Sequence, residues 1–113
     1  MSNVEHRIDY VEFGATDIER IKQFYSRVFG WSFTDYGPAY TSFVDGRLAG
    51  GFSMEAAPGG SPLIVIYAAD LAGTYARVQA NGGNIRKEIF SFPGGRRFHF
   101  ADPSGNELAV WSE

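Results

Sequence analysis

The chain has only two histidines and no cysteine, so few of its side chains can transfer protons or hold a metal near neutral pH. His99 lies in the alternating segment 96–101, and its ordinary pKa of about 6.5 suits acid–base work. Glu12 lies between two apolar residues, and a carboxylate in such surroundings is a candidate base. For both residues a structural role, as a hydrogen-bonded strand side chain, is the favoured alternative, because the sequence shows no partner.

Other combinations of polar residues are better explained as turns. His99 and Asp102 form an H-x-x-D pair, but Asp102 begins an Asp-Pro turn, where its side chain is expected to cap backbone N–H groups. The arginines that follow Pro93-Gly94-Gly95 could bind an anion, although a plain hairpin tip is favoured. The chain has no G-x-S-x-G, P-loop or G-x-G-x-x-G sequence.

The segments that must position these residues occur twice. The run Tyr10–Ile18 is echoed by Leu63–Leu71, and both are mainly apolar and end in Asp followed by an aliphatic residue. Gly30 and Gly83 are separated by the same number of residues as the starts of these two runs. This internal repeat predicts one domain, residues 1–113, built from two similar modules at about 1–57 and about 58–113. Each module is too small to fold alone, so the two are expected to share a sheet or a core.

The first half is predicted as a β-α-β-β-β unit. A strand over 8–13 leads into a helix that is expected to start at the capping box Thr16–Glu19 and to end at Gly30. Strands follow at 31–36, 40–44 and 48–54, with Asp45-Gly46 as a hairpin turn. The helix carries an apolar stripe that is expected to face the core, formed by Ile18, Ile21, Phe24, Tyr25, Val28 and Phe29.

The second half repeats this order. A strand over 63–68 precedes a helix over 70–80 that ends at Asn81-Gly82-Gly83, and three further strands are expected. Because each helix separates strands of its own half, the predicted class is α+β, with helices covering one face of largely antiparallel sheets. The three strands of the second half are expected over 85–91, 96–101 and 107–111.

The composition favours an ordinary globular protein, with 44% hydrophobic and 20% charged residues. A net charge of −3 argues against nucleic-acid binding, which normally requires a basic face. No apolar run approaches the roughly 20 residues that span a bilayer, so we expect no membrane partner and a cytoplasmic location.

Three strings in the chain resemble those of the vicinal oxygen chelate superfamily, which includes glyoxalase I, bleomycin-resistance proteins and extradiol dioxygenases. They are Phe24–Trp31, Asn81-Gly82-Gly83 and Phe100–Asn106. The resemblance implies two βαβββ modules whose strands curl into a partly open, barrel-like sheet around a cup, usually in a homodimer. It also implies a divalent metal in the cup, held by His, Glu or Gln side chains.

The residues at the positions that the resemblance assigns to metal ligands do not suit a metal. The first two positions, seven residues before each helix-opening Asp, hold Tyr10 and Leu63. The last strands of the two modules offer Gly50-Gly51 and Ala109. Losing several donors removes most of the affinity for a divalent ion, so no metal cofactor is expected. A shifted site built from Glu12, His99 and Glu107 is a disfavoured alternative.

Strand alternation sorts the side chains into a face packed under the helices and a face that would line the cup. Phe98 and Phe100 fit the packed face, which leaves Arg97 and His99 toward the cup. If His99 does acid–base work, a nearby carboxylate such as Glu12 could orient it. Aromatic rings with a few polar groups are typical of small-molecule sites. The predicted ligand-binding residues are Tyr10, Glu12, Leu63, Tyr67, Arg97, His99, Glu107 and Trp111.

The leading hypothesis is a metal-independent, homodimeric protein that binds a small, partly aromatic or apolar organic molecule. The alternative is a lyase or isomerase that resembles the glyoxalases and uses His99 or Glu12 as its base, with a non-standard metal site as an option. A purely structural or partner-binding domain is the third class.

Overall fold

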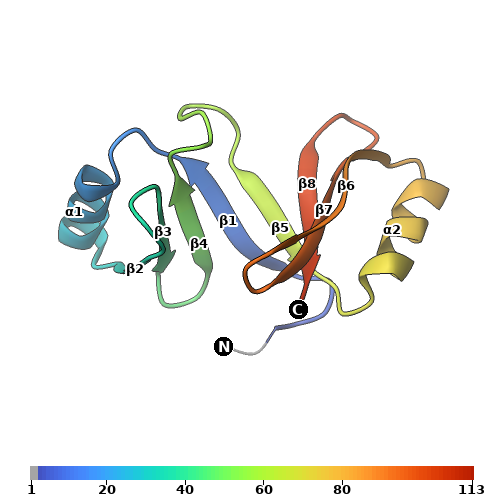
Figure 1. The fold of residues 1–113 in the computed structure, drawn as a ribbon, viewed down its shortest axis with the longest axis horizontal. Helices are drawn as coiled ribbons and strands as arrows, with labels where there is room; N and C mark the ends of the chain where they lie inside the picture. Colours follow the sequence, from blue (N-terminus) through green and yellow to red (C-terminus); the bar gives the residue numbers. More distant parts are fainter. Residues whose placement is uncertain (1–2) are drawn as a thin grey trace. The chain divides into compact units, whose positions relative to one another are not determined.

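The computed structural model describes residues 3–113, which form two helices and eight strands (Figure 1). The α+β class and the two consecutive βαβββ modules are therefore confirmed. In chain order the elements are β1 (Ile8–Gly14), α1 (Ile18–Phe29), β2 (Ser32–Asp35), β3 (Tyr40–Val44), β4 (Ala49–Ser53), β5 (Leu63–Tyr67), α2 (Leu71–Ala80), β6 (Asn84–Phe92), β7 (Gly95–Ala101) and β8 (Glu107–Ser112).

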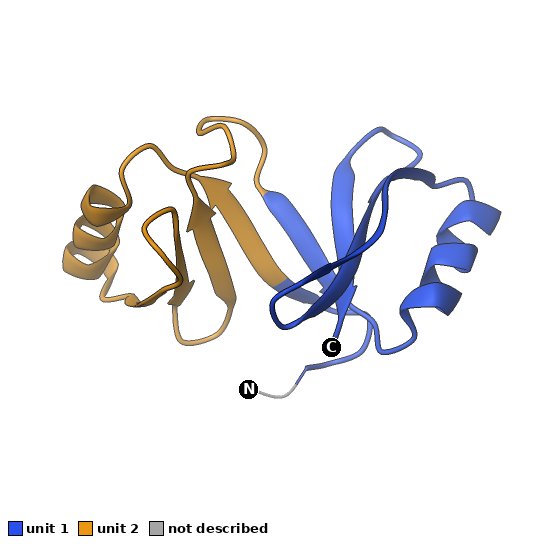
Figure 2. Cartoon of the chain, viewed as in Figure 1, with its two compact units in different colours: residues 1–9, 63–113 blue, residues 10–62 orange. Residues whose placement is uncertain are grey.

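The chain forms two compact units, which Figure 2 distinguishes by colour. Unit 2 consists of residues 10–62, and unit 1 combines residues 63–113 with the chain up to Asp9. The boundary falls inside β1, whose first two residues belong to unit 1. Backbone hydrogen bonds from His6 N to Tyr67 O (2.8 Å) and from Tyr67 N to Arg7 O (3.2 Å) attach residues 6 and 7 to β5.

Both units arrange their strands in the same mixed pattern. The order is β2-β3-β4-β1 in unit 2, where β1 and β4 are parallel and the other pairs are antiparallel. The order is β5-β8-β7-β6 in unit 1, where β5 and β8 are parallel. The strands β2 and β6 have no outer partner strand among residues 3–113, so the sheet is open, as predicted.

The core of unit 2 is a stack of aromatic rings under α1. Trp31 lies between Tyr25 and Phe43, with ring centroids 4.6 Å and 4.5 Å away and nearly parallel planes. Phe43 and Phe52 are each 3% exposed and belong to the same cluster. This stack excludes water over a large apolar area and fixes α1 on one face of the sheet.

The core of unit 1 is more aliphatic than that of unit 2. Phe98 and Ala68 are fully buried, and Leu71 at the start of α2 is 1% exposed. Phe100 packs against this cluster, so the prediction that Phe98 and Phe100 face the helix is confirmed. The sheet of unit 1 is therefore covered by α2 on the face to which Phe98 points (Figure 1).

The predicted start of α1 was wrong in one respect. The N-cap is Asp17, not Thr16, and its Oδ1 accepts a hydrogen bond from the Arg20 N–H at 3.2 Å. Aspartate satisfies an otherwise unpaired N–H and places a negative charge at the positive end of the helix dipole. The predicted end at Gly30 is confirmed, because Gly30 adopts φ = 74°, which favours glycine.

The prediction that the whole apolar stripe of α1 faces the core was also wrong. Ile18, Ile21 and Tyr25 pack inward. Phe24, Val28 and Phe29 are each more than half exposed. The stripe spans a wider arc of the helix than one sheet face can cover, so only its central part is buried.

The turns follow the predictions. Asp45-Gly46 joins β3 to β4 in an antiparallel hairpin, and Asp45 accepts hydrogen bonds from two backbone N–H groups that follow it. Asp102 accepts hydrogen bonds from the side-chain amide of Asn106 at 3.0 Å and from the backbone N–H groups of Asn106 and Ser104, both at 2.9 Å. These bonds, the side-chain one above all, hold the pKa of its carboxyl group below the usual value. Asp102 is therefore a turn residue and not a partner of His99. Neither helix of the described residues is long and apolar enough to cross a membrane.

The cap of α1 gives a direct test of this description. Asp17→Ala is expected to lower the free energy of unfolding by about 1 kcal/mol, because the Arg20 N–H loses its acceptor. Thr16→Ala, the matched control, is expected to change it by less than about 0.5 kcal/mol. Urea denaturation of both variants measures the difference, and a larger loss in the Thr16 variant would contradict the assignment of the cap.

Candidate functional site

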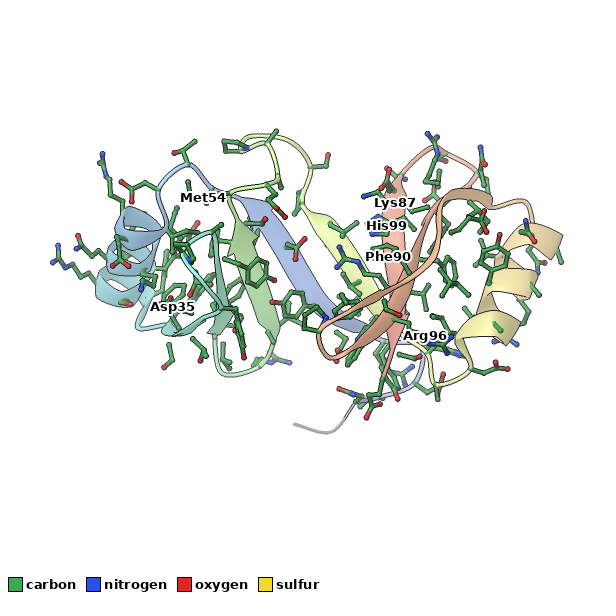
Figure 3. All side chains as sticks on the ribbon, viewed as in Figure 1. Asp35, Met54, Lys87, Phe90, Arg96 and His99 are labelled. Atoms are coloured by element: carbon green, nitrogen blue, oxygen red, sulfur yellow. The ribbon has the colours of Figure 1, made fainter. Side chains whose placement is uncertain are left out.

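Polar side chains gather on the face of the unit 1 sheet that α2 does not cover. Residues that pair across neighbouring strands share a face, and His99 pairs with both Lys87 and Ala109. Figure 3 labels His99, Lys87 and Phe90 on this side of the sheet. We call it the His99 face, and by strand register it comprises Val65, Tyr67, Lys87, Phe90, Phe92, Arg97, His99, Ala109 and Trp111.

A bulged backbone brings both Lys87 and Phe90 to this face. In a regular strand, residues three apart point to opposite faces. Here Lys87 pairs with His99 and Phe90 pairs with Arg97, so three steps on β6 match two steps on β7. The extra residue is a β-bulge, which re-aims the side chains that follow it. It places the ring of Phe90 beside both His99 and Arg97.

His99 is 4% exposed, and only one of its ring nitrogens has a partner. Its Nδ1 lies 3.0 Å from Glu107 Oε2. Because a carboxylate only accepts hydrogen bonds, Nδ1 carries the proton and donates it. In the neutral ring Nε2 is then an acceptor, and this buried atom has no hydrogen-bond partner among residues 3–113.

Burial controls the protonation of His99. Removal from water lowers the pKa of the imidazole, and this effect outweighs the hydrogen bond to Glu107, which raises it. The positive charges of Arg97 and Lys87 lower the pKa further. The net pKa lies below 6.5, so His99 is neutral at neutral pH and Nε2 keeps its lone pair.

The carboxylate that orients His99 is Glu107, and not Glu12 as the sequence suggested. Ala101 pairs with Glu107 and His99 pairs with Ala109, so Glu107 reaches His99 diagonally from the adjacent strand. Sequence alternation identifies which residues share a face but not which of them touch.

Arg97 is the other polar group on this face that lacks a partner. Its guanidinium carbon lies 5.4 Å from the ring centroid of Phe90 and 5.5 Å from that of Phe92. Its Nε is buried and has no hydrogen-bond acceptor within the described part of the chain. No carboxylate of residues 3–113 lies within ion-pair distance of the Arg97 guanidinium.

The other residues of unit 1 that were predicted to bind a ligand are Trp111, Tyr67 and Leu63. Trp111 Nε1 donates to Asp9 Oδ2 at 3.0 Å, and its ring meets Tyr67 edge-on with centroids 5.3 Å apart. The Tyr67 hydroxyl donates to Glu113 at 2.5 Å, and this bond raises the pKa of the phenol. Leu63 is half-buried at the start of β5 and contributes apolar surface only.

Tyr10 and Glu12 belong to a separate hydrogen-bond chain in unit 2, whose central member is Tyr40. The Tyr40 hydroxyl donates to Glu12 Oε2 at 2.9 Å. Its oxygen lies 2.5 Å from the Tyr10 hydroxyl, which must donate in turn because the proton of Tyr40 is already used. Burial and these neighbours raise the pKa of Tyr40 well above its ordinary value, so its phenol stays protonated.

Gly51 makes this chain possible. A Cβ atom at residue 51 would lie 2.0 Å from the Tyr40 hydroxyl and 2.7 Å from that of Tyr10. On the opposite face, a Cβ at Gly50 would collide with the ring of Phe43 at 2.3 Å. The adjacent glycines thus admit a polar group on one face and an aromatic core residue on the other. Sequence reasoning missed Tyr40, although the glycine pair was a signal that other side chains fill this space.

The donor set does not fit a resident divalent metal. Among residues 3–113 the structure shows no group of three or more His, Asp or Glu side chains that could hold an ion. Of the shifted set, Glu107 bonds to His99 in unit 1 and Glu12 accepts from Tyr40 in unit 2. At the positions that the resemblance assigns to metal ligands, Leu63 and Ala109 have no side-chain donor atom. The phenol of Tyr10 is hydrogen-bonded to Tyr40. Divalent ions require several oxygen or nitrogen donors.

Comparison with known proteins gives a consistent picture. The family model described as "Glyoxalase/Bleomycin resistance protein/Dioxygenase superfamily" matches residues 7–110. No match is found among the curated proteins.

Solved structures share the fold. A superfamily member from Vibrio splendidus is 17% identical with a TM-score of 0.71, covering 96% of this chain and 99% of that one. Methylmalonyl-CoA epimerase from Mycobacterium tuberculosis is 11% identical with a TM-score of 0.70, covering 99% and 92%. The Mn(II)-bound glyoxalase from Novosphingobium aromaticivorans is 25% identical with a TM-score of 0.70, covering 99% of this chain but 40% of that one.

The lowered pKa of His99 predicts how stability depends on pH. Below about pH 6.5 the unfolded chain binds a proton at this residue, which the folded chain binds less readily. The free energy of unfolding should therefore decrease as the pH is lowered, by up to about 1.4 kcal/mol per pH unit. His99→Asn keeps a donor where Nδ1 stood and should remove this component. His6→Asn is the control, because His6 is exposed and has φ = 59°, which asparagine tolerates. Urea denaturation between about pH 7 and pH 5 measures it, and an equal loss in all three proteins would refute the assignment.

The hydroxyl chain of unit 2 predicts a second stability effect. Tyr40→Phe removes the donor to Glu12 and the acceptor of Tyr10, and should lower the free energy of unfolding by about 1–3 kcal/mol. Tyr36→Phe is the control because Tyr36 is 65% exposed, and it should cause no measurable loss. Denaturation curves that coincide for the two variants would show that the chain of hydroxyls does not contribute.

Proposed function

Because the chain belongs to the glyoxalase/bleomycin resistance protein/dioxygenase superfamily, we propose that it binds a small, partly aromatic or apolar organic molecule on the His99 face without a metal. The observation that supports this most directly is the buried Nε2 of His99, which has no partner among residues 3–113. A buried polar atom without a hydrogen bond costs about 1–3 kcal/mol. A bound molecule with an O–H or N–H group would supply the missing donor.

The surroundings of His99 suit such a molecule. The ring of Phe90 lies 5.9 Å from the imidazole centroid, and the ring of Trp111 lies 6.3 Å from that of Phe92. Aromatic surface with a few fixed polar groups is typical of sites for small organic molecules, since the rings supply contact area and the polar groups fix orientation. Glu107 holds the imidazole in one orientation, which reduces the entropy that binding would cost.

Metal independence is part of the proposal and rests on the donor set. The Mn(II)-bound glyoxalase is similar in fold, but this chain spans only 40% of it, and the residues described above lack the donors that a divalent ion needs. Homodimer formation, which the resemblance implies, and a cytoplasmic location, which the sequence favours, are further parts of this proposal.

Binding can be followed through a single tryptophan. Trp31→Phe keeps an aromatic ring in the stack of unit 2 and leaves Trp111, on the His99 face, as the only indole. We expect at least one of benzoate, benzyl alcohol and benzylamine to change its fluorescence saturably, because the rings beside it form the proposed site. His99→Asn in the same background should weaken that response. Absence of a saturable change with all three probes would refute the proposed function.

Metal independence has its own test. A chelator should shift the Tm of the purified protein by less than about 1 °C, since a structural metal contributes several kcal/mol to folding. Elemental analysis of the same preparation should show no stoichiometric divalent metal. A metal present in equal molar amount, together with a clear fall in Tm on chelation, would contradict the proposal.

A second candidate function is catalysis of proton transfer in a lyase or isomerase reaction, and the state of His99 favours it. A neutral imidazole with an unpartnered Nε2 and a carboxylate on Nδ1 has the arrangement of a general base. Glu12 is a weaker candidate, because its carboxylate already accepts the Tyr40 proton.

The two bases can be separated by substitution. If the protein catalyses such a reaction, His99→Asn should abolish turnover by removing the lone pair of Nε2, whereas Glu12→Gln should reduce it far less. Exchange of substrate C–H protons with deuterated solvent, followed by NMR, measures the step directly. Full activity in the His99 variant would exclude His99 as the base.

A further inference from the structure

We propose that the molecule bound on the His99 face is a carboxylate attached to an apolar or aromatic group, and that Arg97 holds the carboxylate. This inference rests on the proposed function and adds the chemical class of the ligand. It is carried by the state of Arg97, a half-buried cation whose Nε is buried and which has no hydrogen bond or ion pair to residues 3–113.

The contacts of Arg97 leave its binding edge unused. Its guanidinium carbon lies over the rings of Phe90 and Phe92, at 5.4 Å and 5.5 Å from their centroids. A guanidinium stacks on rings through its faces, whereas it donates hydrogen bonds only from its edge, in the geometry that matches the two oxygens of a carboxylate. The rings therefore orient the group without satisfying its N–H donors.

The acidic residues nearby are already engaged with other donors. Glu107 bonds to His99, Asp9 accepts from Trp111, and Glu113 accepts from Tyr67. Lys87, which pairs with His99 across the strands, adds a second positive charge and forms no ion pair within the described residues. Arg97 and Lys87 thus have no carboxylate of residues 3–113 within ion-pair distance, and an anionic ligand would supply one to Arg97.

His99 fixes where the anion binds. The lone pair of its neutral Nε2 would repel a carboxylate oxygen, whereas the N–H groups of Arg97 attract one. The carboxylate therefore lies at Arg97, and the uncharged part of the ligand lies toward His99 and the ring of Phe90. A monoanion with one apolar end fits this division better than a cation or a molecule charged at both ends.

Benzoate and benzyl alcohol test the role of the charge, since they share a ring and differ at the group that would meet Arg97. The Arg97 Nε–H signal in nitrogen–proton NMR spectra of the native protein should shift with benzoate and not with benzyl alcohol, and benzoate should bind more tightly by about tenfold. Arg97→Met keeps an unbranched apolar stem between the rings and should remove this preference.

Matched variants separate the role of Arg97 from general effects of charge. Arg96 is the neighbouring residue of β7, faces the other side of the sheet, and is labelled in Figure 3. Arg96→Met removes the same charge and should leave benzoate affinity within about twofold. Arg97→Lys keeps the charge but loses the planar N–H edge, so it should not restore the affinity of the native protein.

The outcomes distinguish this inference from the proposed function. Equal affinity for benzoate and benzyl alcohol, or an equal loss in the Arg96 and Arg97 variants, would overturn the inference while leaving small-molecule binding intact. Failure of benzoate to bind at about 10 mM while benzyl alcohol binds would overturn it as well. Failure of every probe would overturn both proposals.

Discussion

Adjacent residues of a β-strand point to opposite faces, and this constraint on β7 underlies the arrangement of unit 1. Phe98 is fully buried under α2, so its neighbours Arg97 and His99 must face the other way. The same helix contact that stabilises the sheet thus determines which side can carry polar groups. A change that moved Phe98 out of the core would also move the two nitrogens that lack partners.

The two units apply one backbone plan to different chemistry. In unit 2 the hydroxyl groups of Tyr10 and Tyr40 occupy the space that a side chain at residue 51 would fill. Tyr10 donates to Tyr40, and Tyr40 donates to Glu12. In unit 1 the fully buried Ala109 pairs with His99, whose imidazole is bonded to Glu107. The hydroxyl chain of unit 2 is internally satisfied, whereas two buried nitrogens of unit 1, Nε of Arg97 and Nε2 of His99, have no partner among residues 3–113. This asymmetry is the physical reason why the proposed ligand is assigned to unit 1.

Most of the fold could be predicted from the sequence because its signals are local. Asp45-Gly46, Gly30 and the Asp102 turn each specify a backbone conformation through their own side chain or its absence. The exposure of Phe24, Val28 and Phe29 on α1 could not be predicted, because the sequence shows an apolar stripe but not how much of it the sheet covers. The hydrogen-bond partners of His99 and Glu12 could not be predicted from the sequence either, because Glu107 and Tyr40 contact them from other strands. Alternation assigns a face, but register and bulges decide which residues touch.

The bulge in β6 has a consequence for how such a site can arise or disappear. Because the bulge between Lys87 and Phe90 sets the direction of the ring, the backbone conformation of this short segment decides whether an aromatic side chain accompanies Arg97. If this segment kept its length but lost the bulge, the alternation beyond it would reverse and carry Phe90 to the α2 side, with no change at Arg97 or His99. Related chains could therefore keep every polar residue of this face and yet differ in what they recognise, so residue identity alone is a poor guide to shared specificity.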